Sequence, residues 1–185
     1  MGKKGNNFRM SHRDLLQLLS LVLVAFFLMS FVQNTSAQKP NFSGSWTYNQ
    51  SKSDQPQGGG GRGFGGGGGT MNIKQDGNNL NVERVFTTQD GEQRTMPSKY
   101  TLDGKESVNP MGNRGSIKSI LTWSADNKSL NFANSSSFQR QDGTPIESKS
   151  SEVWTLTDGG KTLTITSTNT RDGETRTRKR VYDKK

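Results

Sequence analysis

Three side chains stand where they could bind an anion. Arg180 and Tyr182 are separated by one residue near the C-terminus, so on a strand their side chains point the same way. An arginine beside a tyrosine hydroxyl can hold a carboxylate through charge-assisted hydrogen bonds. Arg84 lies between Val82 and Phe86 on the apolar face of a predicted strand, where a buried charge needs a carboxylate or an anionic ligand. We therefore take Arg84, Arg180 and Tyr182 as candidate ligand-binding residues.

Other interpretations of these residues remain open. Arg84 could reach a barrel mouth and place its guanidinium in water. Arg176 and Arg178 are four and two residues from Arg180, so they have the same parity and on a strand would face the same side. Charged side chains ordinarily lie on an exposed face, which would hold for all three.

The composition argues against most forms of side-chain catalysis. The chain of 185 residues has no cysteine and one histidine, His12, which lies in a segment that we expect to be removed. Histidine-dependent nucleophilic catalysis, thiol chemistry and zinc sites with His or Cys ligands therefore lack their parts. Most aspartates fall in Asp-Gly turns, and no spacing brings two carboxylates together for acid–base work. We expect no catalytic residues, no metal site, no cofactor and no enzymatic activity.

The formal charge of +9 is concentrated at the two ends of the chain. Residues 1–37 carry four basic residues and one acidic residue, and residues 176–185 carry six and one. The segment between them holds 15 basic and 14 acidic residues and is nearly neutral. We therefore expect no nucleic-acid partner.

The N-terminus has the pattern of a secretory signal. A basic segment with Lys3, Lys4, Arg9 and Arg13 precedes the apolar run at 15–32, and Thr35-Ser36-Ala37 offers small residues for cleavage. The run of 18 residues also reaches the shortest membrane-spanning length, which leaves a retained anchor as the alternative. We predict a cleaved signal at 1–37, a mature domain at 38–185 without a stable membrane span, and a location in the periplasm or outside a bacterial cell.

The mature segment reads as a series of β-hairpins. Asp-Gly pairs recur at 76, 90, 103, 142, 158 and 172, with Asp126-Asn127 in the widest gap, and Asp-Gly between alternating segments is a strong hairpin signal. Strands are predicted at about 42–48, 70–75, 79–88, 93–102, 115–124, 129–140, 146–157, 162–170 and 174–183. The apolar residues are too few to fill two separate cores. An open sandwich would need connections between strands that are longer than these tight turns. We predict an all-β fold, a single antiparallel up-and-down (meander) barrel of 8–10 strands.

One segment has low complexity. Residues 58–69 are glycine except for Arg62 and Phe64, and we interpret 52–69 as a flexible Gly-rich loop between the first strand and the meander. Neither a Lys-Ser/Thr pair nor a helical pattern follows it, so the glycines do not indicate a phosphate-binding loop.

Short motifs at both ends of the mature segment resemble the calycin superfamily. Phe42-Ser43-Gly44-Ser45-Trp46 is similar to the F-x-G-x-W opening of lipocalins and fatty-acid-binding proteins. Arg180-Val181-Tyr182 is similar to the Arg-x-Tyr with which fatty-acid-binding proteins hold a lipid carboxylate. As a whole the chain resembles small secreted bacterial lipocalin-like proteins, although the Gly-rich segment stands where fatty-acid-binding proteins have a helical lid. The resemblance to lipocalins also implies another role for Arg180, in which it packs over Trp46 and closes the barrel.

These observations lead to two hypotheses about function. In the first, a monomeric barrel binds a small apolar or amphipathic molecule, either anionic or uncharged, in its interior. Arg84, Arg180 and Tyr182 then lie near its polar group, and the walls are formed by Trp46, Tyr100, Trp123, Phe132 and Trp154, with Ser98, Ser119 and Ser167 facing inward. In the alternative, the barrel is filled by its own side chains and acts as a structural or interaction module through its basic C-terminal strand and Gly-rich loop.

Overall fold

The structure is a computed structural model that describes residues 11–13, 38–55, 69–88, 91–111, 115–139, 145–171 and 174–185. The chain divides into two units, Met1–Ser36 and Ala37–Lys185. In the first unit His12 and Arg13 are helical, and the rest of the predicted signal at 1–37 lies outside the described residues. Within the described ranges, no helix has both the length and the apolar character needed to span a membrane.

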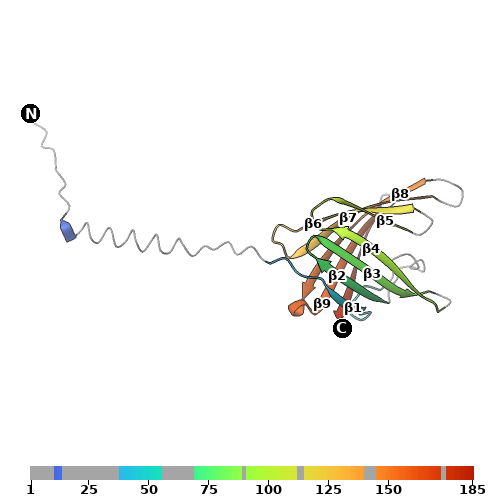
Figure 1. The fold of residues 1–185 in the computed structure, drawn as a ribbon, viewed down its shortest axis with the longest axis horizontal. Coiled ribbons are helices and arrows are strands. Elements are labelled where there is room, and N and C mark those ends of the chain that lie inside the picture. The colour runs from blue at the N-terminus through green and yellow to red at the C-terminus, as the bar shows by residue number, and fades with distance from the viewer. Residues whose placement is uncertain are drawn as a thin grey trace, which may run out of the picture. The chain divides into compact units, whose positions relative to one another are not determined.

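The second unit consists of antiparallel strands (Figure 1). In chain order they are β1 (Gly44–Tyr48), β2 (Thr70–Asp76), β3 (Asn79–Thr87), β4 (Gln93–Thr101), β5 (Glu106–Pro110), β6 (Gly115–Trp123), β7 (Ser129–Gln139), β8 (Pro145–Thr157), β9 (Thr162–Arg171) and β10 (Glu174–Lys184). A short 3-10 helix at Asp158–Gly160 joins β8 to β9.

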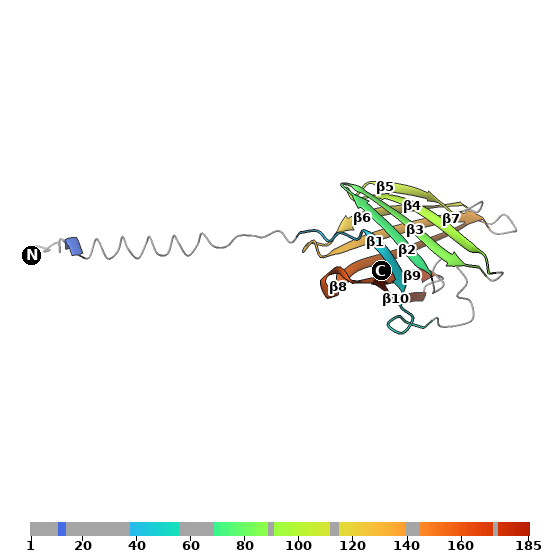
Figure 2. The same ribbon diagram turned by 60° about the horizontal axis from the view of Figure 1, so that its bottom comes forward.

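The strands form a nearly closed up-and-down barrel, as the alternation and the turns predict. The order in the sheet is β4-β3-β2-β1-β10-β9-β8-β7-β6-β5, so all strands that follow one another in sequence are paired except β4 and β5. The first strand pairs with the last, with Trp46 opposite Lys184 and Tyr48 opposite Tyr182. The sheet curls so that its two end strands, β4 and β5, lie side by side (Figures 1 and 2).

The prediction placed nine strands and missed β5. This strand has reversed polarity, because Ser107 and Asn109 are buried inside the barrel while Val108 is 59% exposed outside. Strand prediction from apolar residues on the inner face therefore fails for β5.

Side chains of β5 close the seam between β4 and β5. The Asn109 side chain accepts a hydrogen bond from the Lys99 N–H (2.7 Å) and donates one to the Lys99 carbonyl (3.0 Å), as a backbone partner would. The Ser107 hydroxyl accepts a hydrogen bond from the Thr101 N–H (3.1 Å). These inward polar side chains satisfy backbone groups that an edge strand would leave unpaired.

The predicted turns that the structure describes use positive backbone φ. Gly104, in the turn between β4 and β5, has φ 78°, and Asn127, in the Asp126-Asn127 turn, has φ 57°. Asparagine tolerates this region better than other residues with a side chain, which explains why it stands in for glycine there. Asp90 and the pairs at 142–143 and 172–173 lie outside the described residues.

The segment after β1 lies along β10. The Asp54 N–H donates to the Lys179 carbonyl (3.0 Å), and the Asp54 carboxylate accepts from the Lys179 N–H (2.7 Å). The Ser53 hydroxyl accepts from the Val181 N–H (2.8 Å). The start of the predicted Gly-rich loop at 52–69 is thus hydrogen-bonded to the barrel, while residues 56–68 lie outside the described ranges.

We predict that Asn109→Ala destabilises the barrel by about 1–3 kcal/mol, because the Lys99 backbone loses both partners at the seam. The free energy of unfolding from urea denaturation measures the effect. Val108→Ala is the matched control on the outer face of the same strand, with an expected change within about 0.5 kcal/mol. An Asn109→Ala variant as stable as the control would show that the seam does not depend on this side chain.

Candidate ligand-binding site

The barrel interior is divided into an apolar half and a polar half. Apolar inward residues gather at one end of strands β6, β7, β8 and β9, and toward the other end polar inward residues such as Asn134, Ser150 and Asn169 are mixed with apolar ones such as Ile117 and Ile146. The apolar half is fully enclosed: Trp46, Leu130, Trp154 and Leu163 each have no exposed surface. This half is the hydrophobic core of the protein.

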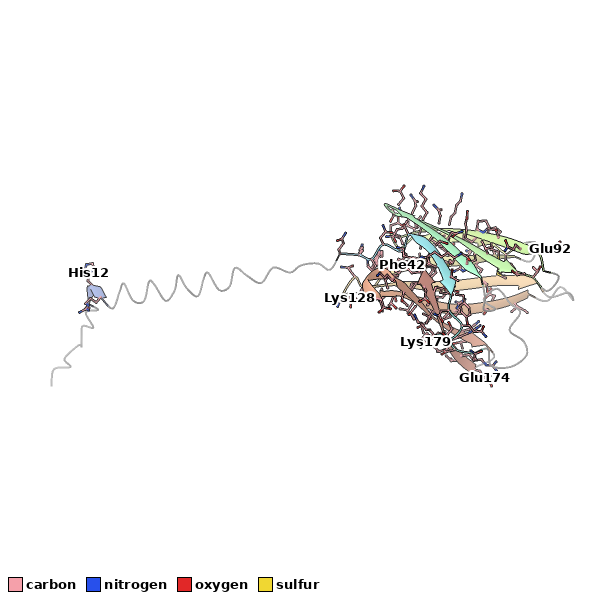
Figure 3. The ribbon with its side chains drawn as sticks, turned by 90° about the horizontal axis from the view of Figure 1, so that it is seen from below. His12, Phe42, Glu92, Lys128, Glu174 and Lys179 are labelled. Atoms are coloured by element: carbon pink, nitrogen blue, oxygen red, sulfur yellow. The ribbon has the colours of Figure 1, made fainter. Side chains whose placement is uncertain are left out.

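Phe42, which precedes β1, fills the end of the apolar half. Its backbone N–H donates to the Gln75 side chain (3.0 Å), and its carbonyl accepts from the Trp46 indole (2.9 Å). Its ring stacks on Trp123 at 6.1 Å and meets Trp154 edge-on at 5.9 Å. Figure 3 shows Phe42 and Lys128 toward one end of the barrel and Glu92 toward the other.

A buried ion pair lies where the two halves meet. Arg180 of β10 donates from Nη2 to Oε1 of Glu152 on β8 at 2.9 Å. Their side chains are only 9% and 17% exposed. The Ser167 hydroxyl on β9 accepts from the same Nη2 (2.6 Å) and is 3.3 Å from Glu152 Oε1. The Trp154 indole donates to the other oxygen, Oε2, at 2.9 Å. Both carboxylate oxygens therefore have hydrogen-bond donors from the protein.

Arg84 faces the same cluster from β3, across the barrel. Its guanidinium carbon lies 5.9 Å from the centre of the Trp154 ring, and its side chain hydrogen-bonds with Tyr100 of β4. Glu152 and Tyr182 are close enough to interact with it electrostatically. Two guanidinium groups thus stand near one carboxylate inside the barrel.

The pKa shifts follow from this charge arrangement. Burial raises the pKa of Glu152, but the positive charges of Arg180 and Arg84 and the Trp154 hydrogen bond outweigh it and hold that pKa below its ordinary value. Burial lowers the pKa of Arg84, and interactions with Tyr100 and Glu152 reverse the shift, so its pKa is raised. Glu152 and Arg84 are therefore both ionised at neutral pH.

Tyr182 joins the cluster from β10. Burial raises the pKa of its phenol, which keeps the hydroxyl protonated and able to donate a hydrogen bond. Its ring meets that of Tyr48, its register partner on β1, edge-on at 5.6 Å.

Comparison with solved structures finds similar folds, among them the following two. Secretory abundant heat soluble protein 4 from Ramazzottius varieornatus is 15% identical, with a TM-score of 0.50 over 78% of this chain and 94% of that one. The fold is calycin-like. The zebrafish ileal bile acid-binding protein, in a structure with cholic acid, is 16% identical, with a TM-score of 0.48 over 78% of this chain and 98% of that one. No family model matches the chain, and no curated protein matches its sequence.

The calycin-like barrel places all the predicted wall residues on its inner side. Trp46, Phe132 and Trp154 are buried in the apolar core, and Tyr100 and Trp123 pack against it while partly exposed. The Phe132 ring contacts Trp154 (4.6 Å) and Tyr100 (5.4 Å). Ser98 and Ser119 are buried, and Ser167 binds Arg180. Their role in binding a ligand stays a prediction.

The basic residue over Trp46 is Lys184, which corrects the closure expected from Arg180. Lys184 is the register partner of Trp46, and its Nζ lies 5.3 Å from the centre of the ring. Arg180 lies four residues before Lys184 on β10, opposite Ile165, and hydrogen-bonds to Glu152. The expectation that Arg180 lies on an exposed face is also wrong, because the residue is 8% exposed.

The sequence interpretation missed Glu152, although a signal for it exists. Glu152 has the parity of Trp154 and Leu156, so it lies on the inner face of the same strand. It lies in register with Ser167, itself opposite Arg178, and this pairing brings it within reach of Arg180. An acidic residue on the apolar face of a strand indicates a buried charge that needs a partner, as Arg84 does on β3.

Glu152→Gln should destabilise the protein at neutral pH by roughly 3–5 kcal/mol, because two buried guanidinium groups lose their carboxylate. The folded-state pKa of Glu152 lies below its ordinary value of 4.5, so the ion pair stabilises the fold above about that pH and is lost as the pH falls below it. The difference in unfolding free energy between wild type and variant, measured by urea denaturation, should therefore shrink in acid.

Two controls accompany this experiment. Glu147→Gln, on the outer face of the same strand, should stay within about 0.5 kcal/mol of wild type. Asp103, Asp126 and Asp183, whose pKa values are also lowered, titrate in wild type and Glu152→Gln alike, so the difference isolates Glu152. A difference that stays constant down to pH 3, reached in roughly half-unit steps, would contradict the assignment.

Proposed function

We propose that this protein is an exported, non-enzymatic binding protein that holds a small amphipathic molecule with an anionic group inside its calycin-like barrel. The cluster of Arg84, Arg180, Glu152 and Tyr182 carries the proposal. Within this cluster two guanidinium groups face one carboxylate, which leaves one excess positive charge, and a partly buried excess charge favours an anion. Small antiparallel barrels of this type hold a single small ligand in lipocalins.

The polar half supports a ligand site better than the apolar half does. The apolar half is packed with the protein's own side chains, such as Phe42, Trp46 and Leu130, which have no exposed surface. In the polar half, inward residues such as Met96, Ser150 and Glu152 keep part of their surface exposed. A ligand would place its polar group at the charged cluster and its apolar part against partly exposed inward residues such as Phe86 and Ile117.

The arrangement of β10 weighs against an interaction module that acts through a basic strand. Its outward side chains, Thr175, Thr177, Lys179, Val181 and Asp183, include one basic residue, and the exposed Arg176 and Lys184 lie toward the two ends of the strand. Arg176 pairs with Glu174, and Lys52 pairs with Asp183.

Within the described ranges, no three His, Cys, Asp or Glu side chains gather to hold a metal ion.

Binding can be tested with dodecanoate and dodecan-1-ol, followed by tryptophan fluorescence and calorimetry. We expect dodecanoate to bind at least about tenfold more tightly, as expected for a hydrogen bond to a charged partner. Trp154, beside both Arg84 and Glu152, should report the binding. Lys118→Met, which removes an exposed cation from the outer face, should change neither affinity. Wild-type protein that responds to neither compound, and carries no small molecule on purification, would contradict the proposal.

Export is a separate prediction that rests on the sequence at 1–37. N-terminal sequencing of the protein from the periplasm or culture medium of a bacterial host should give a chain that begins at Gln38. Replacing Ala37 by a bulky residue should block cleavage, because small residues are required there. A chain that keeps the apolar run at 15–32 would favour a membrane anchor instead.

A further inference from the structure

Arg180 and Arg84 stand in different electrostatic environments. Arg180 donates from Nη2 to both Glu152 and Ser167, so a carboxylate of the protein neutralises its charge. Arg84 hydrogen-bonds with the uncharged Tyr100 side chain and lies over the face of Trp154, and the charge of Glu152 acts on it from a greater distance than on Arg180. Glu152 offers its oxygens to Arg180, Ser167 and Trp154, so its hydrogen-bonding capacity is largely used.

Arg180 also has an N–H group that can donate a hydrogen bond to a ligand. Among the described residues, its Nε is buried without a hydrogen-bond partner. An unpaired buried donor is costly, and an acceptor atom of a ligand would satisfy it. Arg180 can therefore offer a ligand a hydrogen bond while its charge stays paired with Glu152.

We propose that Glu152 is a built-in counter-ion for Arg180, so that Arg84 is the charge partner of the ligand and the site accepts a single negative charge. This inference rests on the binding function proposed above and adds the residue that sets its specificity. A ligand anion paired with Arg180 would have to displace Glu152, leaving a partly buried carboxylate beside a second anion. An anion at Arg84 meets a guanidinium whose described hydrogen-bond partner, Tyr100, is uncharged, and it can still accept from Arg180 Nε and Tyr182.

The proposal assigns different consequences to the two arginines. Arg84→Met should abolish the preference for dodecanoate over dodecan-1-ol, so that the affinity ratio falls from at least about tenfold to near one. The double variant Glu152→Gln/Arg180→Met removes both partners of the ion pair, and replacing both partners by uncharged groups is often neutral for stability. It should reduce the preference, because the hydrogen bond from Arg180 Nε is lost, but not abolish it, because Arg84 is intact. The ratio is the readout, since general damage to the barrel would weaken both probes alike.

The single variant Glu152→Gln gives an independent readout. It frees the Arg180 guanidinium, so the affinity for dodecanoate should rise by about tenfold while that for dodecan-1-ol stays unchanged. Circular dichroism identifies the folded variants, and the double variant keeps the test valid if Glu152→Gln alone does not fold.

The outcomes separate this inference from the proposed function. Loss of the preference in Arg84→Met, with retention in the double variant, supports the assignment. Loss in the double variant, with retention in Arg84→Met, overturns it and makes Arg180 the charge partner, while the proposed function stands. Wild-type protein that binds neither probe overturns the proposed function and this inference with it.

Discussion

The ion pair between Glu152 and Arg180 connects the core of the barrel to its polar interior. Trp154 packs in the apolar core on one side and donates its indole N–H to Glu152 on the other. Ser167 contacts both charges, so β8, β9 and β10 are fixed to one another at this point, and Arg84 brings β3 to it from across the barrel. Two buried charges are tolerable here because their hydrogen-bonding groups are mostly satisfied.

The division of the interior follows from how few apolar residues the chain has. Most of the buried ones are gathered at one end, where Phe42, Trp46, Leu130, Trp154 and Leu163 form a core with no solvent-exposed surface. Serines, asparagines and charges line the other half, and such groups stabilise a fold less than well-packed apolar residues of similar volume. A barrel built only for stability would continue the apolar packing of Leu130 and Phe132 along β7, where Asn134 and Ser136 stand instead. This polar half is the part of the interior where the proposed ligand would bind.

The sequence predicted most of the fold because alternation and turn residues are local signals. The parity of Leu80, Val82 and Phe86 placed Arg84 inside the barrel correctly. Strand β5 was missed because its inward residues, Ser107 and Asn109, are polar and bind backbone groups across the seam. The partner of Arg180 was missed for another reason. Glu152 is 28 residues away, and its approach depends on the registers of β8, β9 and β10, which no local pattern defines.

The basic C-terminus has a different meaning in the structure from the one its composition suggests. Residues 176–185 hold six basic side chains, a concentration that on an exposed face would attract anionic surfaces. The strand instead alternates, so that Arg178, Arg180 and Tyr182 lie toward the interior and Lys179 is the outward basic residue between Thr177 and Val181. At its end Lys184 covers the Trp46 ring. Within this basic segment Arg180 is thus buried and paired with Glu152, and Arg178 is partly buried, while Arg176, Lys179, Lys184 and Lys185 are exposed.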